Sequence, residues 1–184
     1  MSDDESSAKT NPADLEAGFT LFRSGRFQEA EARYASVLSK DHDNFQALVS
    51  LGHLALLSNR LAEAKDILAE AVERRPDDRS KILLAETFYR LDDFRHSASL
   101  FQAVRDDAKA MKLESFEGLV PYQTSGATST RLSLVQTDPL PFVQISVNGN
   151  QRGYLIDTGG AELILDAEFA RRAYAAGFTF LKIP

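Results

Sequence analysis

Residues 45–76 have the sequence FQALVSLGHLALLSNRLAEAKDILAEAVERRP, and this segment carries the clearest folding signal in the chain. Its apolar residues recur every three or four positions, which is the period of an α-helix with one buried face. The last residue, Pro76, cannot continue a helix because it lacks a backbone N–H and its ring clashes with the preceding turn. The segment therefore predicts two amphipathic helices, Phe45–Leu57 and Leu61–Arg74, joined by a short turn.

The same pattern occurs once before this segment and once after it. Gly52 aligns with Gly18 at a spacing of 34 residues and with Ala85 at a spacing of 33. Further aligned sets are Ala30 with Ala64 and Ser97, Tyr34 with Leu68 and Phe101, and Val37 with Ala71 and Val104. The small residues let helices approach closely, and the larger ones fill the gap between them. The sequence thus predicts three helical hairpins over residues 12–107.

The outer two hairpins and a closing helix complete the predicted array. Their helices are expected at Asp14–Ser24, Phe27–Lys40, Ser80–Leu91 and Phe94–Asp107. A short helix over Asp107–Glu117 is expected to follow, because the last repeat of a stacked array exposes a face that needs a cover.

This pattern resembles the tetratricopeptide repeat. The positions that match its small, aromatic, alanine and closing-proline residues are Gly18, Gly52, Leu21, Phe88, Ala30, Ala64, Tyr34, Phe101 and Pro76. The chain departs from the family in lacking the early tryptophan and in closing the first unit at His42 instead of proline. The alternative is an unrelated helical bundle in which the spacing is coincidental.

The resemblance implies a concave surface, lined by the first helix of each hairpin, that binds a peptide or a helix of a partner protein. The residues predicted to face it are Phe19, Phe22, Arg23, His53, Leu56, Glu86, Tyr89 and Arg90. Asn and Lys do not stand where tetratricopeptide domains grip a terminal carboxylate, so a chaperone-tail clamp is not expected. Alternatively, the linker of this same chain covers much of the surface.

The second half changes from helical to strand patterns. Mixed Gly, Pro, Ser and Thr over Gly118–Thr130 predict a linker. Short alternating runs then predict strands at Arg131–Gln136, Phe142–Val147, Gln151–Asp157 and Ala161–Leu165, with a further strand entered at Phe178–Pro184. The dipeptide Asn148-Gly149 predicts a tight hairpin, and Asp166 is expected to cap a helix that reaches about Ala176.

The predicted fold class is therefore α+β with several domains. Residues 1–11 form a disordered N-terminus, 12–107 the helical hairpins, 108–130 a capping helix and linker, and 131–184 a partial strand domain.

Asp157-Thr158-Gly159 is the one motif in the chain that could carry chemistry. It follows an apolar strand and precedes a second one, an arrangement that presents a carboxylate on a tight turn. The surrounding segment, Leu140–Leu165, resembles the retropepsin-like aspartic proteases. The resemblance implies that Asp157 is the catalytic carboxylate, that the Thr158 hydroxyl braces two catalytic loops, and that Gly159 lets the backbone approach substrate. Alternatively, Asp157 only accepts hydrogen bonds within its turn.

An aspartic protease needs two carboxylates that share a proton, so that one activates water and the other protonates the substrate carbonyl. This chain has a single motif, so the protease hypothesis requires a homodimer or a second lobe. The resemblance implies that residues 131–184 form part of an all-β retropepsin-like barrel. The family's substrate-covering flap and later apolar-apolar-glycine segment are missing, so we expect a truncated domain without activity of its own. The alternative is a non-catalytic interaction scaffold, and a third possibility is a strand domain that only binds ligand.

Composition excludes several other functions. The 184 residues include 21 Lys+Arg and 27 Asp+Glu, for a net charge of −6, and 43% are hydrophobic. This acidic balance argues against nucleic acid as a partner. The absence of cysteine excludes disulfides and thiolate metal sites, and the three histidines lack metal-ligand spacing. We predict no metal, no cofactor and no membrane span, and a soluble cytoplasmic protein whose partners are peptides or proteins.

Overall fold

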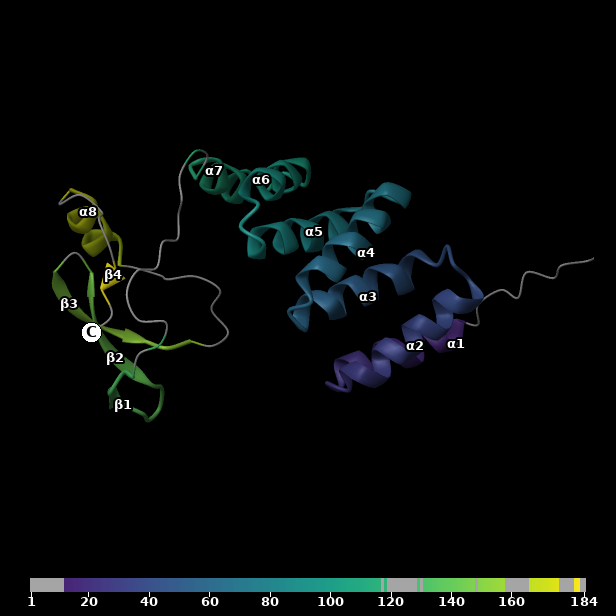
Figure 1. Cartoon of the computed structure of the whole chain (residues 1–184), viewed down its shortest axis with the longest axis horizontal. Coiled ribbons are helices and arrows are strands. Elements are labelled where there is room, and N and C mark those ends of the chain that lie inside the picture. The colour runs from purple at the N-terminus through teal and green to yellow at the C-terminus, as the bar shows by residue number, and fades with distance from the viewer. Residues whose placement is uncertain are drawn as a thin grey trace, which may run out of the picture. The chain divides into compact units, whose positions relative to one another are not determined.

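A computed structural model of the chain describes residues 12–116, 118, 129, 131–147, 149–157, 166–175 and 181–182. The chain divides into two units, Met1–Tyr122 and Gln123–Pro184 (Figure 1). Within the described residues, the first unit contains helices only, and the second contains a small sheet and one helix.

The first unit is a succession of helical hairpins, as the repeat spacing predicts. Its helices are α1 (Pro12–Arg23), α2 (Phe27–Lys40), α3 (Phe45–Leu57), α4 (Leu61–Arg74), α5 (Asp78–Arg90), α6 (Phe94–Ala103) and α7 (Asp107–Glu114). Each helix packs against the next, and α3 also contacts α5, so the hairpins stack in chain order (Figure 1). The prediction of an all-helical repeat array is confirmed.

The turn inside each hairpin is built in the same way. Gly25, Asn59 and Asp92 adopt positive φ values of 75°, 59° and 59°. The next residue in each turn donates its backbone N–H to a carbonyl five residues back, for example Arg60 to Ala55 at 2.9 Å. This hydrogen-bond pattern is typical of an α-helix that ends with one residue in the left-handed conformation, and it reverses the chain within two residues.

Close contact between paired helices explains the small residues of the repeat. A Cβ atom built on Gly52 would lie 2.6 Å from Cγ of Leu68, and one on Gly18 would lie 2.6 Å from Cε1 of Tyr34. Leu68 and Tyr34 are themselves buried, so neither side chain has free space to move into. The glycines are therefore required for the backbones to approach at this distance.

The last hairpin differs from the prediction. The expected helix Phe94–Asp107 is wrong at its C-terminal end, because α6 stops at Ala103. The short helix expected from Asp107 does begin there, as α7, and ends at Glu114. Arg105 adopts a positive φ of 61°, and the Asp106 side chain accepts a hydrogen bond from the Lys109 backbone N–H at 3.2 Å. A cap in this position starts a new helix and ends the old one.

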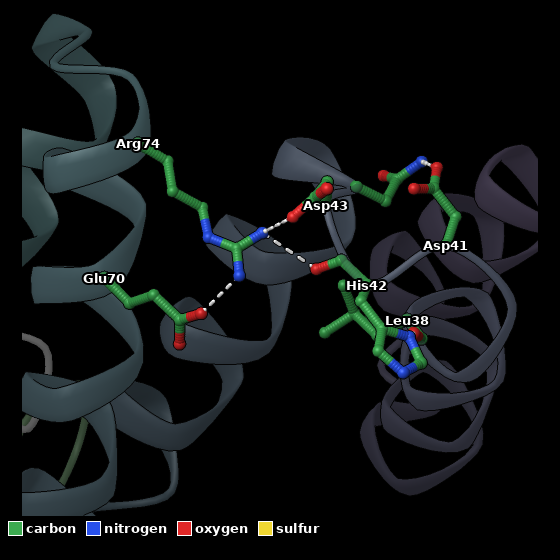
Figure 2. A network of polar contacts seen from close by, with 7 residues as sticks. Leu38, Asp41, His42, Asp43, Glu70 and Arg74 are labelled. Atoms are coloured by element: carbon green, nitrogen blue, oxygen red, sulfur yellow. Dashed lines mark hydrogen bonds and ion pairs between the residues drawn. The ribbon is translucent and has the colours of Figure 1, made fainter.

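Arg74 joins the ends of the first two repeats, as Figure 2 shows. Its Nη1 donates to the carbonyl oxygen of His42 at 2.9 Å and to Oδ1 of Asp43 at 2.6 Å, while its Nη2 donates to Oε1 of Glu70 at 2.6 Å. The first repeat lacks a closing proline at His42, and this contact holds the backbone there instead.

The second unit contains a small sheet made of β1 (Leu134–Gln136), β2 (Phe142–Val147), β3 (Asn150–Leu155) and β4 (Leu181–Lys182). β2 is central and antiparallel to the other three, and β4 pairs with the end of β2 that β1 leaves unpaired. The β2–β3 hairpin is in register from Phe142 opposite Leu155 to Val147 opposite Asn150. The hairpin predicted from Asn148-Gly149 is thus present.

One face of this sheet is apolar. Val143, Ile145 and Val147 alternate along β2 and are buried, as is Phe169 of the helix α8 (Ala167–Ala175). Asp166 begins α8 as predicted, since its Oδ1 accepts the backbone N–H groups of Glu168 and Phe169 at 3.0 Å.

The predicted retropepsin-like barrel is not seen, because the described strands form a small open sheet. The predicted strand Arg131–Gln136 shortens to β1, and the predicted strand Ala161–Leu165 lies outside the described residues.

Candidate partner-binding site

The first helices of the first two hairpins bring together three of the predicted partner-binding residues. Phe19 and Phe22 of α1 and His53 of α3 line a small hollow. Tyr34, Ser50 and Arg79 complete its lining, and its volume is about 10 Å³. The hollow thus lies where α1, α2, α3 and α5 meet, and it has room for about one water-sized group.

Aromatic rings form one side of the hollow. The Phe22 ring lies 5.2 Å from the His53 ring and 5.5 Å from the Phe27 ring, centroid to centroid. Phe19 is 44% exposed, and the Arg23 guanidinium lies over its ring at 5.8 Å. Such rings offer a large apolar area and an attractive face for cations and for other rings.

Two side chains that line the hollow, His53 and Tyr34, have pKa values shifted from their ordinary values. Burial lowers the pKa of His53, and the positive charge of Arg79 lowers it further. Burial raises the pKa of Tyr34, against the opposing effects of the Ser50 hydroxyl and the Arg79 charge, and Glu16 adds to the increase. Both His53 and Tyr34 are consequently neutral near pH 7, and Arg79 supplies the positive charge of the hollow.

Tyr34, Ser50 and Arg79 line the hollow but were not among the predicted partner-binding residues, and Arg79 is the charged one of the three. The predicted helix began at Ser80, whereas α5 begins at Asp78 and includes Arg79 in its first turn. A signal for it was present, since Arg79 lies seven residues before the predicted residue Glu86 and therefore on the same face of a helix.

Two predicted partner-binding residues have structural contacts instead. Leu56 is only 4% exposed and packs in the core of the array. Arg90 is exposed, but its guanidinium donates to the Leu56 carbonyl oxygen and to Oδ1 of Asn59, both at 2.8 Å. It thereby satisfies the C-terminus of α3, whose last carbonyls lack partners within the helix. The other two predicted residues of α5, Glu86 and Tyr89, are half-buried, and the Tyr89 ring packs 6.0 Å from Phe94.

The second predicted site is described only in part. Asp157 follows β3 directly and is exposed. The Ile156 backbone N–H donates to the Pro141 carbonyl oxygen at 2.9 Å, which extends the pairing of β3 toward Asp157. Thr158 and Gly159 lie outside the described residues, so their predicted roles remain predictions.

The described parts of the chain contain neither a cluster of metal ligands nor a membrane-spanning helix. No group of three or more His, Cys, Asp or Glu side chains is placed there to hold a metal ion. Among the described helices, none has the length and the apolar composition needed to cross a bilayer.

The helical unit is similar in fold to several proteins of known structure. The type III secretion chaperone SycD of Yersinia enterocolitica, in complex with a peptide of the translocator YopD, superimposes with a TM-score of 0.55 at 14% identity, over 62% of this chain and 99% of that one. A second SycD structure, described as an alternative dimer, gives 0.51 at 14% identity over 63% and 100% of the chains.

A eukaryotic protein shows the same fold similarity. The Hsp90 co-chaperone Cns1 of Saccharomyces cerevisiae gives a TM-score of 0.50 at 15% identity, over 61% of this chain and 39% of that one. No curated protein sequence matches the chain. Residues 21–87 match the profile of the tetratricopeptide repeat family, so the N-terminal region of this chain carries tetratricopeptide repeats.

Proposed function

We propose that the chain is a protein-interaction module that binds an extended segment of a partner protein on the surface around Phe19, Phe22, His53 and Arg79. The observation that carries this proposal is the cluster of aromatic rings around a cationic hollow, with Phe19 44% exposed. Aromatic and arginine side chains dominate the energetically important positions of protein interfaces. This function was the alternative interpretation of the sequence, behind the protease.

The fold similarity supports this proposal. SycD, whose fold the helical unit shares, has been crystallised with a bound peptide of its translocator. In the chain described here, the first helices of the hairpins supply an aromatic and cationic surface of their own. A surface of this kind suits a segment that contributes apolar side chains.

A selection experiment tests the proposal. The full chain, immobilised, is used to select binders from a random displayed peptide library, and the selected peptides are then measured against variants by fluorescence anisotropy. Phe19→Ala is expected to weaken binding about tenfold, the effect of losing a moderate interface anchor. Met111→Ala is the matched control, because Met111 is 69% exposed on α7 and does not line the hollow.

Two results contradict this proposal. One is a selection that yields no peptide with measurable affinity for the full chain. The other is a set of selected peptides that bind Phe19→Ala as tightly as the wild type, which would place the binding surface elsewhere.

Our second proposal is that Asp157 contributes one carboxylate to an aspartic protease site. The observation that favours it is the β2–β3 hairpin followed directly by an exposed Asp157, which is the order that the resemblance to retropepsin-like proteases implies. Such a site needs a second carboxylate close enough to share a proton. A second copy of the chain would supply it through a two-fold axis.

Cleavage of a fluorescein-labelled unfolded casein, measured from acidic to neutral pH, tests the second proposal. Cleavage that disappears in Asp157→Asn and persists in Asp138→Asn would support it. Asp138 is a suitable control because it is an exposed aspartate of the same unit. Equal rates for the wild type and Asp157→Asn would reject it for this chain.

A further inference from the structure

We propose that Arg79 selects the bound segment by pairing with one of its carboxylates, so that the partner is an acidic segment with an apolar side chain next to the acidic residue. The apolar side chain packs on Phe19 and Phe22. This inference rests on the proposed interaction function and names the chemistry of the partner.

Five of the ten arginines in the described part of the helical unit have acidic partners. The pairs in the helical unit are Arg26 with Glu29, Arg33 with Asp14, Arg60 with Glu31 and Glu63, Arg74 with Asp43 and Glu70, and Arg75 with Asp77. Among the described residues, no acidic side chain lies within ion-pair distance of Arg79, although its side chain is exposed. Arg79 differs from the other arginines without an ion pair in that it lines the hollow, and a carboxylate is the preferred geometric partner of a guanidinium.

Three acidic residues near this surface do not line the hollow. The charge of Arg79 lowers the pKa of Asp77, but Oδ1 of Asp77 accepts the Ser80 backbone N–H at 2.7 Å and its Oδ2 lies 3.9 Å from Arg75. The charge of Glu16, on α1, raises the pKa of Tyr34, and Glu86 lies two helical turns beyond Arg79 on α5. None of the three lines the hollow itself, and Arg23 adds a second positive charge beside Phe19.

The size and chemistry of the hollow also fit a carboxylate oxygen. Its volume of about 10 Å³ matches the space that one water-sized atom group needs. Tyr34, Ser50 and His53 line it beside Arg79, so residues with hydrogen-bond donor groups reach it from three helices, α2, α3 and α5.

The test uses the peptides selected by the full chain. The selected sequences are expected to be enriched in Asp or Glu next to an apolar residue, relative to the unselected library. Replacing the acidic residue by its amide isostere is expected to weaken binding to the wild type about tenfold, since a hydrogen-bonded charge pair contributes on this order. The same replacement should have little effect on binding to Arg79→Gln.

A matched variant separates this effect from the loss of any positive charge. Arg95 is exposed on α6 and has no ion pair with the described residues, so Arg95→Gln removes the same charge at a distance from the hollow. It is expected to keep the full discrimination between acid and amide peptides. Helical circular dichroism spectra of both variants, matching that of the wild type, would show that folding is retained.

The outcomes distinguish this inference from the proposed function. Selected peptides without acidic enrichment, or acid and amide peptides of equal affinity, would overturn the role of Arg79 while leaving peptide binding in place. Tighter binding after deletion of residues 1–11, which contain Asp3, Asp4 and Glu5, would also overturn it, because the chain's own N-terminus would then be the occupant. A failure of the selection would instead reject the interaction function.

Discussion

A single methyl group at Gly52 has no room in this structure. Its Cβ would lie 2.6 Å from Cγ and 2.7 Å from Cδ2 of Leu68, and 3.3 Å from Cγ2 of Ile67. Leu68 is fully buried, so the collision is with packed core and not with a mobile side chain. The residue type at this position therefore sets the distance between α3 and α4.

We expect Gly52→Ala to destabilise the helical unit by about 1 kcal/mol. Alanine gains about 1 kcal/mol in helix propensity over glycine, but overpacking a core costs about 1–3 kcal/mol. The measurement is urea unfolding followed by helical circular dichroism. In a Leu68→Ala background the collision is gone, so there Gly52→Ala should stabilise by up to ~1 kcal/mol. A loss of equal size in both backgrounds would contradict the steric explanation.

His53 links stability to pH. Burial, reinforced by Arg79, lowers its pKa below the unfolded value of about 6.5. The unfolded chain consequently binds a proton more readily than the folded chain, and the folded state loses stability as pH falls from about 7 through 6.5 toward the lowered pKa. In His53→Gln this part of the pH dependence is expected to disappear. Urea midpoints measured between neutral and mildly acidic pH would test it, and parallel curves for the two proteins would contradict it.

Capping separates α7 from α6. Asp106 accepts the Lys109 N–H, and α7 buries Ala110 and Leu113 against the last hairpin. The caps of α5 and α6 use Asp77 and Asp93 in the same way. A short helix of this length depends on such a cap and on packing, because it is marginal on its own.

We expect Asp106→Ala to loosen α7 by about 1 kcal/mol, the usual cost of removing an N-cap. Hydrogen exchange of the backbone amides of α7 should accelerate about fivefold, while the amides of α3 and α4 keep their rates. Asp106→Asn is the matched control, because asparagine caps a helix as well as aspartate does. Equal acceleration in both variants would show that charge, and not the cap, stabilises α7.

The contact of Arg74 combines ion pairs with a neutral acceptor. Asp43 is 90% exposed, so its pair with Arg74 contributes little, whereas the His42 carbonyl bond does not depend on a second charge. We expect Arg74→Ala to destabilise by about 1 kcal/mol and Asp43→Ala by less than about 0.5 kcal/mol. Urea unfolding at low and high salt would measure both. If the two variants lost equal stability, the carbonyl bond would have no role.

Over the whole molecule, regular features could be predicted and exceptions could not. The 34-residue spacing gave the helices α2, α3 and α4 with their observed ends, because hydrophobic period and turn length agree there. The end of α6 at Ala103 was missed, since neither Gly nor Pro marks it and Arg105 adopts the left-handed conformation instead.

The residues of the candidate site could likewise be predicted only in part from the sequence. Phe19, Phe22 and His53 were found because they follow the helical period on the first helices. Leu56 was assigned to the surface although it is buried, because a helix turns by about 100° per residue and a small error in phase moves a side chain into the core. The pairing state of Arg79 depends on residues distant in sequence, so no local pattern could reveal it.

The ion pair between Arg60 and Glu31 gives the array a fixed order. Arg60 Nη2 lies 2.8 Å from Oε1 of Glu31 in the preceding repeat. At the corresponding positions of the next junction the chain has Asp93 and Lys65, so the signs are exchanged. A duplicate of the second repeat, inserted after itself, would place an arginine opposite Lys65 and meet like charge. The repeats are therefore not equivalent at their junctions, and a copied second repeat would exchange a favourable ion pair for a contact between like charges.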